Sequence, residues 1–132
     1  MNDNIKTLLK FMPVSQSILF IKGLHGSERR YIESIATKIS KIITNAPTLY
    51  ETDGQGDTVK PVLHYFWGCV DIFVTEIDKT NGEHFGYTSL GHGYLESGYI
   101  NLKYIFNEIP LLNLDFNFKP KTIYEYKKIY QG

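Results

Sequence analysis

Six side chains in the middle of the chain are of the types that perform acid–base or metal chemistry: Asp71, Glu76, Asp78, His64, His84 and His92. Carboxylates in different environments can divide into an acid and a base, and His together with Asp can hold a metal. The spacings that mark metal sites, such as His-x-His, His-x-x-x-His or Cys-x-x-Cys, do not occur. The sequence therefore predicts no catalytic residue, no metal site and no cofactor.

Asp71 and Glu76 lie in an apolar segment, 69–77, that is typical of a strand. Side chains alternate between the two faces of a sheet, so residues five apart are expected on opposite faces. We do not expect one site to collect both carboxylates. A small enzyme that uses Glu76, Asp71 and His92 is therefore the third interpretation of the chain, behind two kinds of binding protein.

The segment KGLHGS (22–27) is a candidate phosphate site. We expect a strand at 17–23 (SILFIKG) and a helix at 28–45, and a turn that leads into a helix presents free N–H groups to an anion. The segment lacks both the Gly-Lys-Ser/Thr ending of a P-loop and the spacing of a dinucleotide fingerprint. An ordinary turn into a helix is the alternative interpretation.

The helix predicted at 28–45 has isoleucines and an alanine at helical spacing on one side. Its polar side carries the basic residues Arg29, Arg30, Lys38 and Lys41. These residues could follow a nucleic-acid backbone, with Tyr31 or Tyr50 stacking on bases. A solvated helix face is the other interpretation.

The stretch FGYTSLGHGYLESGYINL (85–102) holds four glycines, at 86, 91, 93 and 98. Gly86 within a strand favours a bulge, and the Gly91–Gly93 region favours a tight reversal. We therefore expect an irregular loop over 91–99, with His92 and Tyr94 at its tip, and a short helix that starts near Asn101. The loop is either a complicated connection or a binding loop.

The pattern of elements predicts an α+β fold, with an antiparallel sheet of about four or five strands covered on one side by the long helix. Short helices are expected at both ends of the chain. We expect a single domain, 1–132, with a helix–strand–helix part at 1–50, an acidic, Gly-rich loop at 51–60 and a sheet part at 61–132.

The chain has 132 residues, of which 42% are apolar and 21% are charged, and its formal net charge is zero. The charge is unevenly distributed: residues 1–50 carry seven Lys and Arg against three Asp and Glu, and residues 51–100 carry two against eight. A general attraction to nucleic acid or membranes is not indicated. One cysteine, no signal peptide and no apolar run of about 20 residues predict a cytoplasmic protein.

Residues from 60 onward contain Trp-Gly, Thr-Glu, Phe-Gly, Leu-Gly-x-Gly, Gly-Tyr and a late Asp in an alternating strand. This series resembles the domain of unknown function 2958 family over about 70 residues. The matching residues are Trp67, Gly68, Thr75, Glu76, Phe85, Gly86, Leu90, Gly91, Gly93, Glu96, Gly98, Tyr99, Leu102, Asp115, Phe118 and Pro120. The chain departs from the family at Asp71-Ile72, where the family has Thr-Trp, and at Leu114 and Asn117, where it has Arg and His. The resemblance implies an accessory role on plasmids, phages or conjugative elements.

The leading hypothesis is a non-enzymatic binding protein of a mobile genetic element, an antagonist of a host restriction or CRISPR-type defence complex. Ten tyrosines suit a recognition surface, and acidic residues can compete with nucleic acid for a basic cleft. The partner would be a host protein or a protein–nucleic-acid complex, and the oligomeric state stays open. A nucleic-acid-binding accessory protein is the alternative. The predicted contact residues are Glu51, Asp53, Asp57, His92, Tyr94, Glu96 and Tyr99.

Overall fold

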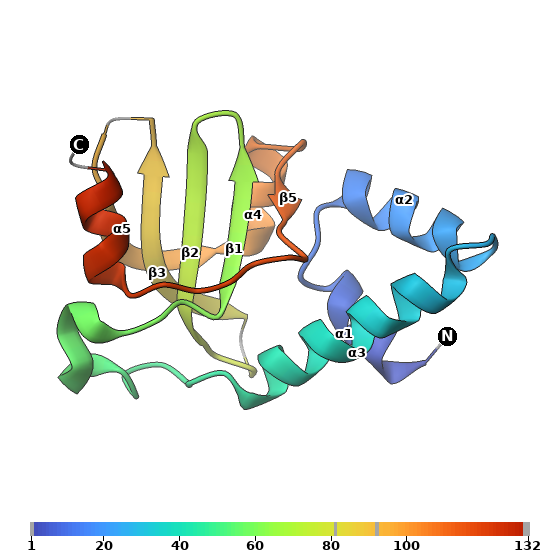
Figure 1. Ribbon diagram of the computed structural model, residues 1–132, viewed down its shortest axis with the longest axis horizontal. Helices are drawn as coiled ribbons and strands as arrows, with labels where there is room; N and C mark the ends of the chain where they lie inside the picture. Colours follow the sequence, from blue (N-terminus) through green and yellow to red (C-terminus); the bar gives the residue numbers. More distant parts are fainter. Residues whose placement is uncertain (1, 81, 92, 131–132) are drawn as a thin grey trace.

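The computed structural model describes residues 2–80, 82–91 and 93–130. Three helices come first and the sheet follows, as Figure 1 shows. The helices are α1 (Asp3–Leu9), α2 (Val14–Leu24), α3 (Arg29–Asn45), α4 (Leu102–Glu108) and α5 (Ile123–Tyr130), with a 3₁₀ helix η1 at Asp53–Thr58. The strands are β1 (Leu63–Trp67), β2 (Val70–Ile77), β3 (Glu83–Leu90), β4 (Glu96–Asn101) and β5 (Asn113–Leu114). The predicted α+β class with an antiparallel sheet and short terminal helices is confirmed.

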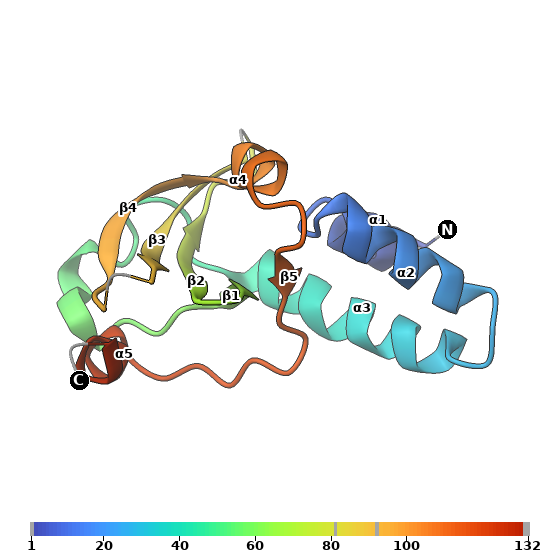
Figure 2. The ribbon, with the colours of Figure 1, turned by 90° about the horizontal axis from the view of Figure 1, so that it is seen from above.

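The five strands form one antiparallel sheet in the order β4-β3-β2-β1-β5. Both of its faces are covered, with α4 and α5 on opposite sides (Figure 2). On the first face, Leu63, Ile72 and Val74 share one core with the buried residues of α1 and α3 and with the apolar side of α4. On the second face, Phe73 stacks on Tyr126 of α5, with ring centroids 4.3 Å apart. The long helix α3 therefore shares the first face with α1 and α4, and extends beyond the sheet beside α2 (Figure 1).

The prediction of a strand at 17–23 is wrong, because this segment belongs to helix α2. Its short apolar run fits a strand and a helix equally well by periodicity. Neighbouring contacts decide the outcome: α2 lies against α3 so closely that a Cβ on Gly23 would meet the side chain of Ile32 at 2.0 Å. Residues 22–24 consequently end helix α2 and residues 25–27 lie in the turn that leads to α3, so the strand-to-helix geometry expected for phosphate is absent from the segment 22–27.

The irregular loop expected over 91–99 is also partly wrong. Residues from Glu96 onward form β4, which pairs with β3 in an uninterrupted register from Glu83 opposite Asn101 to Thr88 opposite Glu96. Asn101 ends the strand and caps α4, since its side chain accepts a hydrogen bond from the Tyr104 amide at 3.1 Å. Glu96 and Tyr99 therefore lie on a rigid strand instead of a loop tip.

A β-bulge in β2 places Asp71 and Glu76 on the same face, against the expectation that they lie on opposite faces. The register shifts between Val74 and Glu76, so Asp71 pairs with Ser89 and Glu76 pairs with Phe85. The extra residue, Thr75, is buried, and its hydroxyl donates to the Phe85 carbonyl at 3.1 Å. A bulge inserts one residue and inverts the alternation beyond it. Periodicity alone does not reveal such an insertion.

None of the described helices is long and apolar enough to cross a membrane.

The neighbouring glycines Gly86 and Gly98 give a direct test of the β2–β3–β4 packing. A Cβ on Gly86 would meet the Phe73 carbonyl oxygen at 1.9 Å, whereas a Cβ on Gly98, its partner on β4, meets nothing within 4 Å. We expect Gly86→Ala to lower the free energy of unfolding by about 1–3 kcal/mol, as overpacking does. Gly98→Ala is the matched control and should change it by less than about 0.5 kcal/mol. Equal losses in urea unfolding would contradict this packing.

Candidate functional site

A buried carboxylate fixes the connection between the helical part and the sheet. Glu76 is 2% exposed, and it accepts hydrogen bonds from the Tyr50 amide at 2.9 Å, the Thr52 amide at 2.8 Å and the Thr52 hydroxyl. Tyr50 takes a left-handed backbone conformation (φ 73°), which a non-glycine residue adopts only when its surroundings hold it. Glu76 thus holds residues 50–52 in one conformation against the second face of the sheet.

This turn places the acidic segment 51–57 beside β4. The hydroxyls of Tyr50 and Tyr99 hydrogen-bond to each other at 2.9 Å, although both rings are mostly exposed, at 62% and 61%. The Tyr99 ring also packs edge-on against Phe85, with centroids 5.6 Å apart. The hydrogen bond to Tyr50, slight burial and then the negative charges of Glu83 and Asp53 raise the pKa of the Tyr99 hydroxyl. These carboxylates therefore act on the same surface as the two tyrosines.

We call this region the acidic β4 surface and define it by five residues. They share exposure to solvent and a position along or beside β4 on the second face: Tyr50, Glu51, Asp53, Glu83 and Tyr99. A shallow hollow of about 180 Å³ continues it between η1 and β3, lined by Thr52, Asp53, Gly56, Val59, Thr75, Phe85 and Tyr87. The surface combines negative charge with exposed aromatic rings, a combination that suits a protein partner.

Three of the contact residues predicted from the sequence, Glu51, Asp53 and Tyr99, belong to the acidic β4 surface. Glu96 lies on the other face of β4, where the Tyr94 hydroxyl is hydrogen-bonded to its carboxylate, which raises the pKa of Tyr94. Two other contact predictions fall elsewhere. Asp57 forms an ion pair with Lys127 of α5 at 3.1 Å, and His92 lies outside the described residues.

A second polar cluster lies on the same face of the sheet, around His64. Its Nε2 lies 2.7 Å from Asp71 Oδ1 and its Nδ1 lies 3.0 Å from Asp115 Oδ2. Tyr130 of α5 donates its hydroxyl to the other oxygen of Asp71. The ring stacks on Phe73 at 4.8 Å, so the cluster is enclosed by aromatic side chains. It borders a hollow of about 310 Å³ lined also by Phe118, Lys119, Tyr126 and Ile129.

The cluster favours the charged forms of His64 and Asp71 and the neutral form of Tyr130. Burial lowers the pKa of His64, but the hydrogen bonds to Asp71 and Asp115 outweigh it and the pKa is raised. Burial likewise opposes ionisation of Asp71, yet the bonds from His64 and Tyr130 hold its pKa below the usual value. Burial and the bond to Asp71 raise the pKa of the Tyr130 hydroxyl. Each nitrogen of the imidazolium faces a carboxylate, so the ring serves as a two-sided donor that joins β1, β2 and the segment after β5.

The candidate acid–base residues are therefore dispersed. Glu76 and Asp71 share a face, but their β3 partners are four residues apart, which corresponds to about 13 Å along a strand. His84 lies on the opposite face, buried edge-on against Phe11, where burial lowers its pKa. Among the described residues no group of three or more His, Cys, Asp or Glu is arranged to hold a metal ion.

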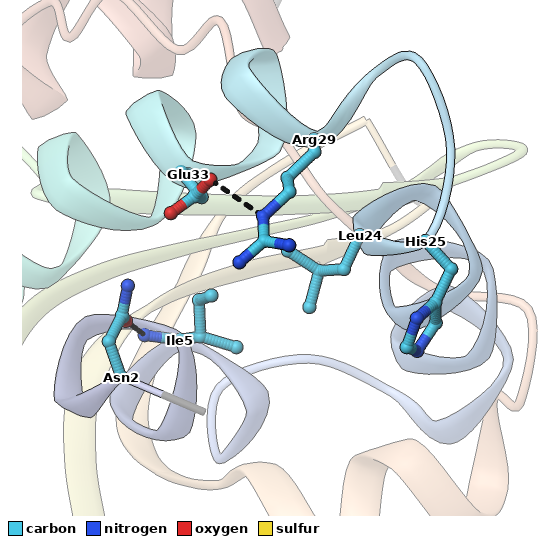
Figure 3. Close-up of a pocket in the computed structure, with 6 residues that line it drawn as sticks. All are labelled: Asn2, Ile5, Leu24, His25, Arg29 and Glu33. Atoms are coloured by element: carbon cyan, nitrogen blue, oxygen red, sulfur yellow. Dashed lines mark hydrogen bonds and ion pairs between the residues drawn. The ribbon is translucent and has the colours of Figure 1, made fainter.

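The basic residues of α3 do not form one face. Arg29 pairs with Glu33 at 3.2 Å and lines a pocket of about 400 Å³ with His25 and Leu24 (Figure 3). Lys38 instead reaches the carbonyl of Phe116 at 3.0 Å. Arg30 and Lys41 remain exposed. Of the four residues predicted to bind nucleic acid, Arg30 and Lys41 therefore remain exposed on a common side of the helix. The pocket beside Arg29 also contains the negative charge of Glu33.

Sequence reasoning missed Asp115 as a partner of His64, Tyr130 as a partner of Asp71, and Glu83 as part of the acidic β4 surface. Long-range pairs such as His64 with Asp115 leave no local spacing signal. The alternation of Ser97, Tyr99 and Asn101 with Gly98 and Ile100 is a strand signal that could have located β4.

The His64 cluster predicts a specific dependence of stability on pH. A raised pKa in the folded state means that its stabilisation is full below pH 6.5 and is lost as the pH rises through the folded pKa. The Asp71 contribution is present above pH 3.8 and is lost as the pH falls through its lowered pKa. His64→Gln should lower the free energy of unfolding by about 2–3 kcal/mol at pH 6. It should also abolish the decline of this free energy above pH 6.5. Urea unfolding across pH 5–9 measures this, and a decline that persists in His64→Gln but disappears in the surface control His25→Gln would contradict it.

Glu76 allows a second test, on the turn that carries Tyr50. In Glu76→Gln an amide NH₂ replaces one acceptor oxygen, so at least one of the three donors loses its partner. We expect a loss of about 1–3 kcal/mol in the free energy of unfolding and faster hydrogen exchange at the amides of Tyr50 and Thr52. Glu108→Gln on exposed α4 is the control with the same charge change. Unchanged exchange at both amides would refute the role given to Glu76.

Comparison of the chain with protein-family models, with curated proteins and with solved structures gives no match.

Proposed function

We propose that the chain is a non-enzymatic binding protein that recognises a basic surface of a protein partner through its acidic β4 surface. The observation that carries the proposal is the hydrogen bond between Tyr50 and Tyr99, which brings the predicted contact residue Tyr99 beside the acidic segment that starts at Glu51. Tyrosines of this kind bury large area at low entropic cost, and the carboxylates around them supply charge complementarity.

The proposed partner is a host protein or protein–nucleic-acid complex, in particular a restriction or CRISPR-type defence complex. Such complexes hold nucleic acid in basic clefts, and a surface with several carboxylates can compete for them. The resemblance of residues 60–130 to the domain of unknown function 2958 family supports a role on a mobile genetic element, where an antagonist of defence is useful.

The test is a tagged pull-down from host lysate, with and without nuclease, that compares matched charge variants. Glu51→Gln with Asp53→Asn removes two charges from the acidic β4 surface, and Glu28→Gln with Glu108→Gln removes two exposed charges elsewhere. We expect a stoichiometric protein that survives nuclease, about tenfold weaker capture by the first variant, and unchanged capture by the second. Binding should also weaken as salt increases.

Two results would overturn the proposal. Capture that depends on nucleic acid and is lost after nuclease treatment would transfer the function to Arg30 and Lys41 of α3. Equal capture by both charge variants would show that the partner binds another surface.

A further inference from the structure

The two edges of the sheet differ in how their backbone groups are satisfied. At β5 the side chain of Gln16 takes the place of a neighbouring strand: its Nε2 donates to the Leu114 carbonyl at 2.9 Å, and the Leu114 amide donates to its Oε1 at 2.8 Å. At β4, no strand formed by residues 2–80, 82–91 and 93–130 pairs with the outer side. The protein thus closes one edge and leaves the other open.

The open edge lacks the features that usually prevent a strand from pairing. Exposed edges are commonly protected by Lys, Pro, a bulge or very short length. The six residues of β4 contain neither Lys nor Pro, and their register with β3 is regular throughout. Glu96, at one end of the strand, is its only charged residue. An added chain can therefore hydrogen-bond along the whole length of β4.

A small hollow beside this edge suits a side chain of the added strand. Gly98 carries no side chain, and a Cβ at this position would meet no atom within 4 Å. A hollow of about 160 Å³ at this point is lined by Thr88, Glu96, Ser97, Gly98, Tyr99 and Ile100. Because Glu96 belongs to the lining, a long cationic side chain, Lys or Arg, is complementary to the charge of the hollow.

Either a second copy of this chain or a segment of another protein could pair with the open edge of β4, and the charge around β4 distinguishes between them. A second copy paired edge to edge would bring its own Glu51, Asp53 and Glu83 towards the same carboxylates, and like charges oppose such pairing. A basic segment would neutralise them. The carboxylates flank both ends of the strand, with Glu96 at its start and Glu83 opposite its last residue, Asn101.

We propose that β4 receives an extended, basic segment of the partner as a sixth strand, with a Lys or Arg side chain in the hollow over Gly98. Main-chain hydrogen bonds supply affinity in this mode, and pockets for alternate side chains supply specificity. The inference rests on the proposed function and names the form in which the partner binds.

The experiment uses the full chain and the peptide acetyl-TKVKVRVKT-amide as probe, at low salt. Two further versions carry N-methyl groups on the amides of either the odd or the even positions. A strand that pairs along one edge uses only alternate amides, so one methylated version should bind at least tenfold more weakly and the other should bind like the parent. Amide exchange within 96–101 should slow on binding of the parent peptide.

Gly98→Val and Gly26→Val form the matched pair of protein variants. A Cβ at either glycine meets no atom within 4 Å, so both chains are expected to fold. Valine at 98 occupies the hollow and should weaken the parent peptide about tenfold, whereas valine at 26, in the turn between α2 and α3, should leave affinity unchanged. Circular dichroism and urea unfolding of both variants confirm that they are folded.

The possible results distinguish strand addition at β4 from the proposed recognition of a basic partner by the acidic β4 surface. Equal binding of both methylated versions, with affinity lost in Glu51→Gln with Asp53→Asn, overturns strand addition and supports a basic ligand of the acidic β4 surface. Failure of all peptides to bind, while the lysate partner is still captured through Glu51 and Asp53, overturns strand addition alone. Failure of the peptides and of capture overturns both.

Discussion

The buried hydrogen bonds of Glu76 are the interaction on which the exposed surface depends. A carboxyl group away from water requires hydrogen-bond partners, and here two backbone amides and a hydroxyl donate to it. The bulge at Thr75 is what aims this side chain at the second face, and Ile77 returns to the first core beyond it. One inserted residue therefore both anchors the chain that enters from α3 and preserves the packing of the sheet.

The second face is held at its other end by a comparable arrangement. His64 joins Asp71 to Asp115, and Asp71 in turn receives the hydroxyl of Tyr130, so a single cluster ties two strands to the segment after β5 and to α5. The carboxylates that resemble catalytic groups in the sequence thus attach peripheral segments to the sheet. Glu51, Asp53 and Glu83, around Tyr50 and Tyr99, are not used in this way and remain exposed.

The fold class was predictable because the strongest patterns are local. The isoleucines of α3, the alternation in β2 and the Asn101 cap each identify an element from adjacent residues. The secondary structure of residues 17–23 could not be predicted from adjacent residues. An apolar run of that length forms a helix or a strand according to the elements that pack against it. β4 was missed because Gly98 resembles a loop residue, and only its register opposite Gly86 explains it.

The candidate site was predictable in its residues and not in its arrangement. Acidic and aromatic residues exposed in two separate segments suggested contacts, but nothing in the sequence shows that Tyr50 meets Tyr99. The same holds for Asp71 and Glu76, whose shared face follows from a bulge that leaves no periodic signal. Contacts between residues about fifty positions apart depend on the order of the strands in the sheet. That order is not encoded in any short segment of the sequence.

The side-chain amide of Gln16 on Leu114 also governs how copies of the protein behave in a crowded solution. A sheet with two free edges can add molecules at both of them and grow without limit into a fibre, which is the route to amyloid-like deposits. With the β5 edge occupied by Gln16, any edge-to-edge association through β4 ends after one addition. Because Gln16 occupies the backbone groups of Leu114, edge-to-edge association of this sheet is limited to a pair of molecules.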